Sequence, residues 1–286
     1  MPPVVALSAG IVGVGMIGAG VARSLHRSGR RATVADISAE AAAALTDIAD
    51  VVPAPADVAR TADVVHIAVV DYDQVLDVLE GERGILRGVA DRAGAAPVIA
   101  LLSTVSLEQF HDLRGRVATA GAELIDCPVA RGDLADRNGM IAMAGGDTEP
   151  VERARPVIEA WARTLIHCGP AGSGMVIKIA RNAITFGMWS LLEETSSLTR
   201  SAGASEEALF HTIRESDPSG ELLFQWRQIS GSLPPSGPGR DRELDRSRTI
   251  LSKDLGAAAG LGRDHGVATP TLDAVRVSIL RELGIG

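Results

Sequence analysis

The chain has 286 residues, more than one ordinary hydrophobic core organises, so we expect two domains. Hydrophobic residues make up 46% and charged residues 22%, which argues against wholesale disorder, and aromatic residues, at 3%, offer no stacking platform for bases. The formal net charge of -8 argues against attraction to nucleic acid or to an anionic membrane, so we expect a small dissolved partner.

The N-terminal half alternates short apolar runs with helical patterns, which is typical of repeated strand-helix units in a parallel α/β sheet. We expect strands at residues 10–12, 33–35, 64–70, 97–102, 123–126 and 140–144, and helices between them that include residues 16–28 and 107–119. The apolar N-terminus lacks a basic residue before Arg23, so we interpret it as strand, turn and helix, not as a secretory signal.

No stretch of the sequence is long enough to span a bilayer. The two cysteines, Cys127 and Cys168, cannot form a disulfide framework, and nothing near them has paired metal-ligand spacing. We therefore expect the reduced thiols of a cytoplasmic protein and no metal site.

A glycine-rich turn follows the first expected strand and opens the first helix. It reads Gly13-Val14-Gly15-Met16-Ile17-Gly18. The first glycine permits a tight turn, the second lets a pyrophosphate approach the backbone, and the third lets helix and strand pack closely. This pattern also occurs in α/β proteins without a ligand, so by itself it predicts a dinucleotide site only weakly.

Asp36 ends the second expected strand about 20 residues further on, where a carboxylate accepts hydrogen bonds from ribose hydroxyls. It would repel a 2'-phosphate, and neither Ile37 nor Ser38 supplies a positive charge, so we expect NAD rather than NADP. The alternative is that Asp36 only caps the next helix.

After Gly174 the strand signals vanish and a helical pattern continues to about residue 202. We expect further helices to start after Ser205 and at Thr269-Pro270, an exposed loop at residues 231–239, and a solvated charged face at residues 240–248. We thus predict a doubly wound, Rossmann-type domain over residues 1–170 and a helical domain over residues 171–286 that begins with a long interdomain helix.

Lys178 and Asn182 lie four residues apart on that long helix, so both side chains share one face and Asn182 can hold the lysine amine by a hydrogen bond. The neighbours of Lys178 are apolar, which predicts a buried helix where a lysine is costly unless it serves a site. The alternative is a surface lysine on an amphipathic helix.

In four motifs taken in order, the chain resembles the β-hydroxyacid dehydrogenase family, which includes 3-hydroxyisobutyrate dehydrogenase and tartronate semialdehyde reductase. The motifs are residues 13–18, 126–132, 172–182 and 253–255. The resemblance covers nearly the whole chain. It implies that Lys178 is the catalytic acid and base, that Asn182 helps to place the substrate, and that the chain forms a homodimer or homotetramer through its helical domain.

The same resemblance implies that Lys253 lines the cleft near cofactor and substrate, and that Val69, Val70 and Thr104 contact the cofactor. An ordinary surface lysine and simple core valines are the alternatives.

The substrate motif departs from the commoner family pattern, because Ala130 and Arg131 stand before Gly132 where serine and glycine are usual. Ala130 has only its backbone amide to offer, but Arg131 presents a fork of donors suited to a carboxylate or sulfonate. An arginine here resembles the sulfolactaldehyde reductase branch of the family. The alternative is an Arg131 that forms a salt bridge with Asp133 or Asp136 and points away.

These observations predict an NAD-dependent oxidoreductase that transfers a hydride between nicotinamide and a small anionic 3-hydroxy acid or its semialdehyde. A sulfolactaldehyde-type reductase remains an alternative. So does an imine reductase, although those enzymes usually carry aspartate or tyrosine at the position of Lys178 and prefer NADP. A third alternative is a non-catalytic NAD-binding relative, but such relatives tend to lose the lysine.

Overall fold

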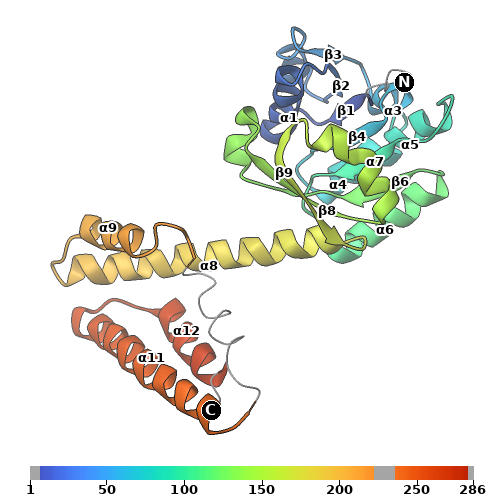
Figure 1. Cartoon of the computed structure of the whole chain (residues 1–286). Coiled ribbons are helices and arrows are strands. Elements are labelled where there is room, and N and C mark those ends of the chain that lie inside the picture. The colour runs from blue at the N-terminus through green and yellow to red at the C-terminus, as the bar shows by residue number, and fades with distance from the viewer. Residues whose placement is uncertain (1–6, 222–235, 283–286) are drawn as a thin grey trace. The chain divides into compact units, whose positions relative to one another are not determined.

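The computed structural model describes residues 7–221 and 236–282 (Figure 1). The chain divides into two compact units, residues 1–182 and 183–286. The dividing point lies inside a long helix, whereas the sequence places the domain boundary at residue 170, before that helix begins. Within the described residues, no helix is long and apolar enough to cross a membrane.

The first unit is built on a nine-stranded sheet. Its strands are β1 (Ala9–Val12), β2 (Ala32–Ala35), β3 (Ala49–Val51), β4 (Val64–Ile67), β5 (Val98–Leu101), β6 (Glu123–Asp126), β7 (Val129–Ala130), β8 (Met140–Gly145) and β9 (Ala162–Gly169). The spatial order is β3-β2-β1-β4-β5-β6-β8-β7, and β9 pairs with β8. Strands β1 to β6 are all parallel in the order of a doubly wound dinucleotide fold, which confirms the predicted fold class.

Between residues 7 and 172, the structure has seven α-helices and one 3-10 helix beside the strands. They are α1 (Met16–Arg27), α2 (Ala39–Ala43), α3 (Pro55–Thr61), α4 (Tyr72–Glu80), α5 (Ile85–Ala90), α6 (Leu107–Thr119), η1 (Gly132–Arg137) and α7 (Thr148–Ile158). The predicted helix at residues 107–119 is confirmed, and a capping box of Ser106 and Gln109 fixes its start.

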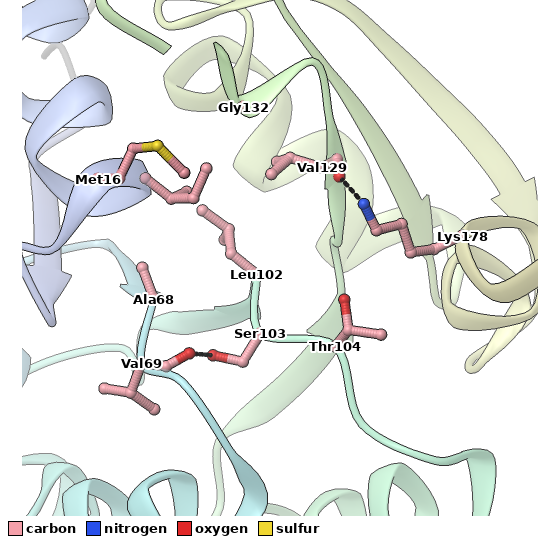
Figure 2. A pocket seen from close by; sticks show the side chains of 10 residues that line it. Met16, Ala68, Val69, Leu102, Ser103, Thr104, Val129, Gly132 and Lys178 are labelled. Carbon is pink, nitrogen blue, oxygen red and sulfur yellow. Dashed lines mark hydrogen bonds between the residues drawn. The ribbon is translucent and has the colours of Figure 1, made fainter. Parts of the chain in front are cut away.

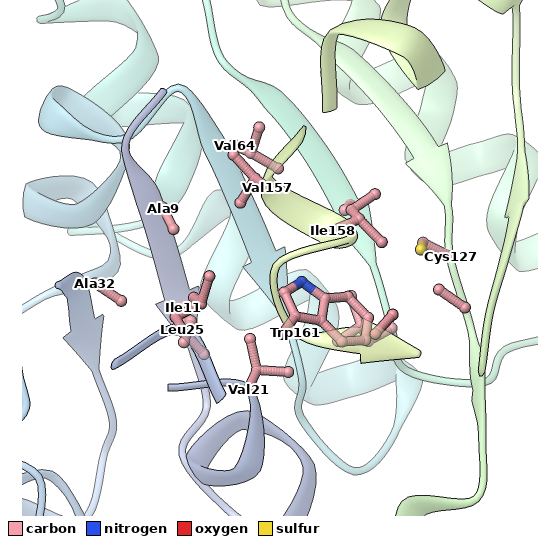
Figure 3. Packing of buried hydrophobic residues seen from close by; sticks show 14 of the residues in the cluster. Ala9, Ile11, Val21, Leu25, Ala32, Val64, Cys127, Val157, Ile158 and Trp161 are labelled. Carbon is pink, nitrogen blue, oxygen red and sulfur yellow. The ribbon is translucent and has the colours of Figure 1, made fainter. Parts of the chain in front are cut away.

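Alternate residues of the parallel strands enter two separate hydrophobic cores, one on each face of the sheet. Ile11 of β1 packs in the first core with Val21 and Leu25 of α1 and with Trp161, as Figure 3 shows. Val12, the next residue, packs in the second core. Burial on both faces explains why these strands read as continuous apolar runs.

The structure corrects three expectations in this unit. The strand expected at residues 64–70 ends at Ile67, so Val69 and Val70 lie in the following loop. The sheet is not wholly parallel, because β8 runs antiparallel to β6 and β7. The sequence also did not reveal three strands (β3, β7 and β9), which are either very short or, in β9, largely accessible to solvent.

The second unit is helical over its described residues. The helix α8 (Ser173–Ser201) ends in this unit and is followed by α9 (Glu206–Ser216), α11 (Pro238–His265) and α12 (Pro270–Glu282). Ser205 caps α9 by accepting a hydrogen bond from the Ala208 amide, and α12 begins at Pro270, so both predicted helix starts are confirmed. Glu194 of α8 caps α12 by accepting the amides of Thr271 and Leu272.

The loop expected at residues 231–239 lies partly outside the described residues, which resume at residue 236. Its end is helical, since α11 begins at Pro238. Proline at a first helical position is compatible with a helix, because the amide it lacks has no partner there. The charged segment 240–248 therefore belongs to the first turns of α11.

Candidate active site

The glycine turn has the geometry that its sequence predicts. Gly13 adopts φ +89°, and a side chain there would collide with the backbone of Ala68. A side chain on Gly18 would collide with the carbonyl of Gly13, so the third glycine allows helix α1 to pack against the turn. Nothing lies within 4 Å of a side-chain position at Gly15, which leaves room for a ligand to approach the backbone.

The start of α1 is suited to phosphate. Within this described helix, Gly15 provides no side-chain cap and the first turn holds no acidic residue. Amides at a helix start that lack an internal partner favour an anion, and the helix dipole adds to this preference. The open space at Gly15 and these amides together fit the pyrophosphate of a dinucleotide.

Asp36 follows β2 and joins two segments of the cofactor site. One carboxylate oxygen accepts the Val14 amide at 2.6 Å, and the other accepts the Ser38 amide at 2.7 Å. The carboxylate therefore stands beside the glycine turn, where ribose hydroxyls bind in this fold. The adjoining Ile37 is fully exposed and brings no positive charge for a 2'-phosphate.

A cavity of about 330 Å³ lies where the chain leaves the carboxyl ends of β4 and β5, the edge at which α/β sheets bind ligands (Figure 2). It is lined by Met16, Ile17, Ala68, Val69, Leu102, Ser103, Thr104, Val129, Gly132 and Lys178. The Ser103 hydroxyl donates to the Val69 carbonyl at 2.7 Å, which ties the two strand-end loops together. The lining is largely apolar, and Lys178 is its charged member.

The amine of Lys178 lies against the wall of this cavity. It donates to the carbonyl oxygen of Val129 at 2.5 Å, as Figure 2 shows, rather than to Asn182 as the spacing predicted. Burial lowers the pKa of the Lys178 amine, and the positive charge of Arg181 lowers it further. An amine of this kind releases a proton more readily than an exposed lysine.

Six of the residues expected in the site line the cavity together: Met16, Ile17, Val69, Thr104, Gly132 and Lys178. Ala68, Leu102, Ser103 and Val129 also line it and were not expected. Val70, which was expected to contact the cofactor, is 82% exposed. Ala130 is buried in β7, next to the cavity-lining Val129.

The apolar neighbours of Lys178 are less buried than expected. Met175 is buried, but Val176, Ile177 and Ile179 are each nearly half exposed in the single chain. They were expected to bury this helix, so this part of the expectation is wrong for the isolated chain.

Arg131 has an unusual backbone and a salt-bridged side chain. Its φ of 60° lies in the left-handed region, which the glycine usual in the family adopts without steric cost and an arginine adopts only with strain. Its guanidinium binds the Asp133 carboxylate through two nitrogens, each at 3.0 Å, and both side chains are about half exposed or more. Asp136 pairs with Arg23 instead.

The remaining two expected site residues lie further along the chain. Asn182, the last residue of the first unit, accepts a hydrogen bond from Arg181 at 3.3 Å. Lys253 belongs to α11 of the second unit, where its exposed amine lies 3.2 Å from Asp254.

Comparisons with known proteins agree with this geometry. The family described as the NAD binding domain of 6-phosphogluconate dehydrogenase matches residues 8–169. An uncharacterised oxidoreductase of Mycobacterium tuberculosis is 30% identical over 281 residues, which are 96% of this chain and 93% of that protein. The NAD-dependent L-serine dehydrogenase of Pseudomonas aeruginosa is 25% identical over 274 residues, 95% of this chain and 90% of that protein.

Among solved structures, a crystal structure of an oxidoreductase from Mycobacterium avium matches with a TM-score of 0.80 and 29% identity, covering 98% of this chain and 99% of that one. The matched segment contains the glycine turn and Asp36, and the relatives extend the likeness over nearly the whole chain, including the helix that carries Lys178. The chain therefore belongs to the β-hydroxyacid dehydrogenase family and is an NAD-binding oxidoreductase.

Proposed function

We propose that this protein oxidises a small 3-hydroxy acid, or reduces the corresponding semialdehyde, with Lys178 as the proton-transfer group. The observation that carries the proposal is the half-buried amine of Lys178, with its lowered pKa, in the cavity beside the glycine turn. NAD supplies the hydride acceptor when bound. In the oxidation, the neutral Lys178 amine accepts the hydroxyl proton, and in the reduction the ammonium returns it.

The choice of basic residues across the chain supports this role. Of its 28 lysines and arginines, Lys178 and Lys253 are the only lysines. An arginine keeps its proton at every accessible pH and cannot serve as a general base, whereas a lysine amine can. One of the two lysines of this arginine-rich chain thus lies in the cavity, where the proposed reaction needs a group that can release a proton.

A panel of substrates tests the reaction. Turnover is measured with NAD and with NADP against 3-hydroxyisobutyrate, serine, glycerate, threonate and sulfonated C3 compounds. We expect NAD-linked turnover of at least one, and a loss of about 10²- to 10⁴-fold in kcat for Lys178→Ala. Lys178→Arg keeps the positive charge but cannot give up a proton at accessible pH, so it should be equally impaired. NAD affinity, measured by calorimetry, should stay near that of the unmodified protein, and turnover retained in both variants would contradict the role.

Arg131 is our proposed anchor for the substrate anion. Its salt bridge with Asp133 is exposed, and exposed pairs contribute little, so a carboxylate or sulfonate can replace Asp133 at small cost. Arg131→Gln should then raise the KM for the acid several-fold and leave kcat nearly unchanged. Asp133→Asn is the matched control: it releases the same guanidinium and should leave KM unchanged or lower it. Equal KM values in all three proteins would place Arg131 outside the site.

We also propose that the chain forms a homodimer or homotetramer through the helical unit. Ile184, Phe186 and Trp189 of α8 are 50%, 54% and 62% exposed in the single chain, and their spacing spreads them around the helix. A helix that is apolar on several faces is expected to be covered by another surface. Sedimentation equilibrium should give a dimer or tetramer, weakened by Trp189→Ser and unaffected by Val51→Ser, an exposed apolar position of the first unit.

A further inference from the structure

The carboxylate of Asp126 is buried and does not line the cavity of the candidate active site. Asp126 is the last residue of β6, is fully inaccessible to solvent, and pairs across the sheet with Gly145 of β8. Burying a carboxylate is costly unless hydrogen bonds compensate for the lost water. Its partners therefore indicate what the residue does.

Those partners are amides at the start of α8, the helix that carries Lys178. One carboxylate oxygen accepts the Gly172 amide at 2.7 Å, and the other accepts the Met175 amide at 2.7 Å. Amides at a helix start have no partner within the helix, and a carboxylate there also interacts favourably with the helix dipole. Asp126 thus fastens the first turn of α8 to the end of β6.

Two glycines bring the backbone close enough for this contact. A side chain at Gly145 or at Gly174 would collide with the Asp126 carboxylate. At Gly174 it would also collide with the carbonyl of Met143 in β8. The joint between sheet and helix therefore has little room to shift while the carboxylate holds both amides.

The joint determines where the lysine amine lies. Met175, held by Asp126, is three residues before Lys178, about one helical turn. Val129, whose carbonyl accepts the Lys178 amine, is three residues after Asp126 itself. The donor, Lys178, is thus about one helical turn from a residue that Asp126 binds, and the acceptor, Val129, is a short segment away from Asp126 along the chain.

We infer that Asp126 is a positioning residue, which holds the Lys178 amine in the cavity by fastening the start of α8 to the end of β6. The inference rests on the proposed role of Lys178 in proton transfer. Without the two accepted amides, the first turn of α8 frays, and the amine leaves both the Val129 carbonyl and the cavity wall.

Asp126→Asn tests the inference, because the asparagine side chain has one oxygen acceptor and places its NH2 donor opposite the other backbone amide. Asp63→Asn is the matched control. Asp63 also accepts a backbone amide, from Ser8 at 2.9 Å, and pairs with Arg92 at 2.7 Å, but it lies at the amino end of β4, whereas the cavity lies at the carboxyl end. Asp126→Asn loses a buried carboxylate and Asp63→Asn a partly buried one. The melting temperatures of the two variants then show whether they are destabilised to the same extent.

The first readout needs no substrate. Acetic anhydride labels the two lysines, and peptide mass spectrometry gives the ratio of Lys178 to Lys253 labelling within one sample. We expect this ratio to rise several-fold in Asp126→Asn, because the released amine becomes accessible, and to stay unchanged in Asp63→Asn. An unchanged ratio in Asp126→Asn would overturn the inference even if the protein is an active dehydrogenase.

The second readout is kinetic, with whichever 3-hydroxy acid the substrate panel identifies. Misplacement of a catalytic group by about 1 Å lowers kcat by about 10²-fold, so a loss of about 10- to 100-fold is expected for Asp126→Asn, with NAD affinity kept. Loss of kcat to the same extent in Asp63→Asn would assign the effect to stability and refute positioning. If Lys178→Ala is fully active, the proposed function fails, while the labelling ratio still decides the position of the amine.

A measurement on the unmodified protein covers the case in which Asp126→Asn does not fold. Hydrogen exchange of the Gly172 and Met175 amides should be slow, although first-turn amides of a helix usually exchange rapidly. The first turn of α11, whose N-cap Gly237 provides no side-chain cap, is the internal reference. Equal exchange at the two helix starts would refute the fastening of α8 by Asp126.

Gly174→Ala is a further variant. A side chain there forces the helix away from the Asp126 carboxylate, so this variant should reproduce the rise in Lys178 labelling.

Discussion

His66 makes the folded state sensitive to acid. Its ring lies fully buried in β4, where Nδ1 donates to the Gly10 carbonyl at 2.9 Å and Nε2 accepts the Trp161 indole N–H at 3.1 Å. These two bonds require the neutral ring. Burial lowers the pKa of His66 from 6.5 to about 4, with the Gly10 hydrogen bond acting in the opposite direction. The fold therefore binds its proton much more weakly than the unfolded chain does.

The sign and size of the effect follow from that difference. A depressed histidine pKa contributes stability above pH 6.5, and this stability is lost as the pH falls toward about 4. About pH 5 is about 1.5 pH units below the pKa of the histidine in the unfolded chain, which is therefore protonated, while the histidine in the folded chain is still largely neutral. At about 1.36 kcal/mol per unit, the unfolding free energy falls by about 2 kcal/mol relative to about pH 8.

Urea unfolding at about pH 8 and about pH 5, at fixed protein concentration, measures this loss. Other groups titrate in the same interval, so the comparison needs a variant that lacks only the histidine. His66→Gln offers one donor and one acceptor in a similar volume and does not titrate. We expect the acid-induced loss to be about 2 kcal/mol smaller in His66→Gln. Equal losses in the two proteins would refute the assignment to His66.

Other substitutions test separate features. Gly13→Ala, at φ +89° and against the neighbouring backbone, should weaken NAD binding at least tenfold in calorimetry, whereas Gly115→Ala, with open space in α6, should not. Arg131→Gly should raise the melting temperature by about 2 °C, because relief of the left-handed backbone outweighs an exposed salt bridge; a lower value would contradict the strain. Trp161→Phe leaves the His66 acceptor without a donor and should cost about 1–3 kcal/mol in urea unfolding.

The parts of the fold that could be predicted from sequence are those with a local cause. Alternating burial on two faces makes β1 and β5 uniformly apolar, and the capping box at Ser106 marks the start of α6. The strand β3 is only three residues long and β7 only two, too short for any periodicity to appear. The eight residues of β9 are mostly accessible to solvent, so they lack the apolar run of a buried strand.

The candidate site divides in the same way. The glycine spacing and Lys178 are visible in the sequence, and Met16, Ile17 and Lys178 line the cavity, although most of the apolar neighbours of Lys178 are not buried. The partner of the Lys178 amine is a backbone carbonyl, that of Val129, which has no sequence signature and lies 49 residues away. Ala68 and Leu102 resemble ordinary core residues, and only their place at strand ends makes them cavity walls. For Arg131 the sequence left two interpretations open, and the structure shows its salt bridge with Asp133.

The double hydrogen bonding of Asp36 has a consequence for attempts to redesign cofactor preference. The usual route from NAD to NADP replaces this carboxylate with a small or basic residue, to remove its repulsion of a 2'-phosphate. Here the same carboxylate also holds the Val14 amide inside the glycine turn. A replacement would therefore release the loop that receives the pyrophosphate, and affinity for both nucleotides would fall together. Successful redesign needs a second change that secures that loop independently.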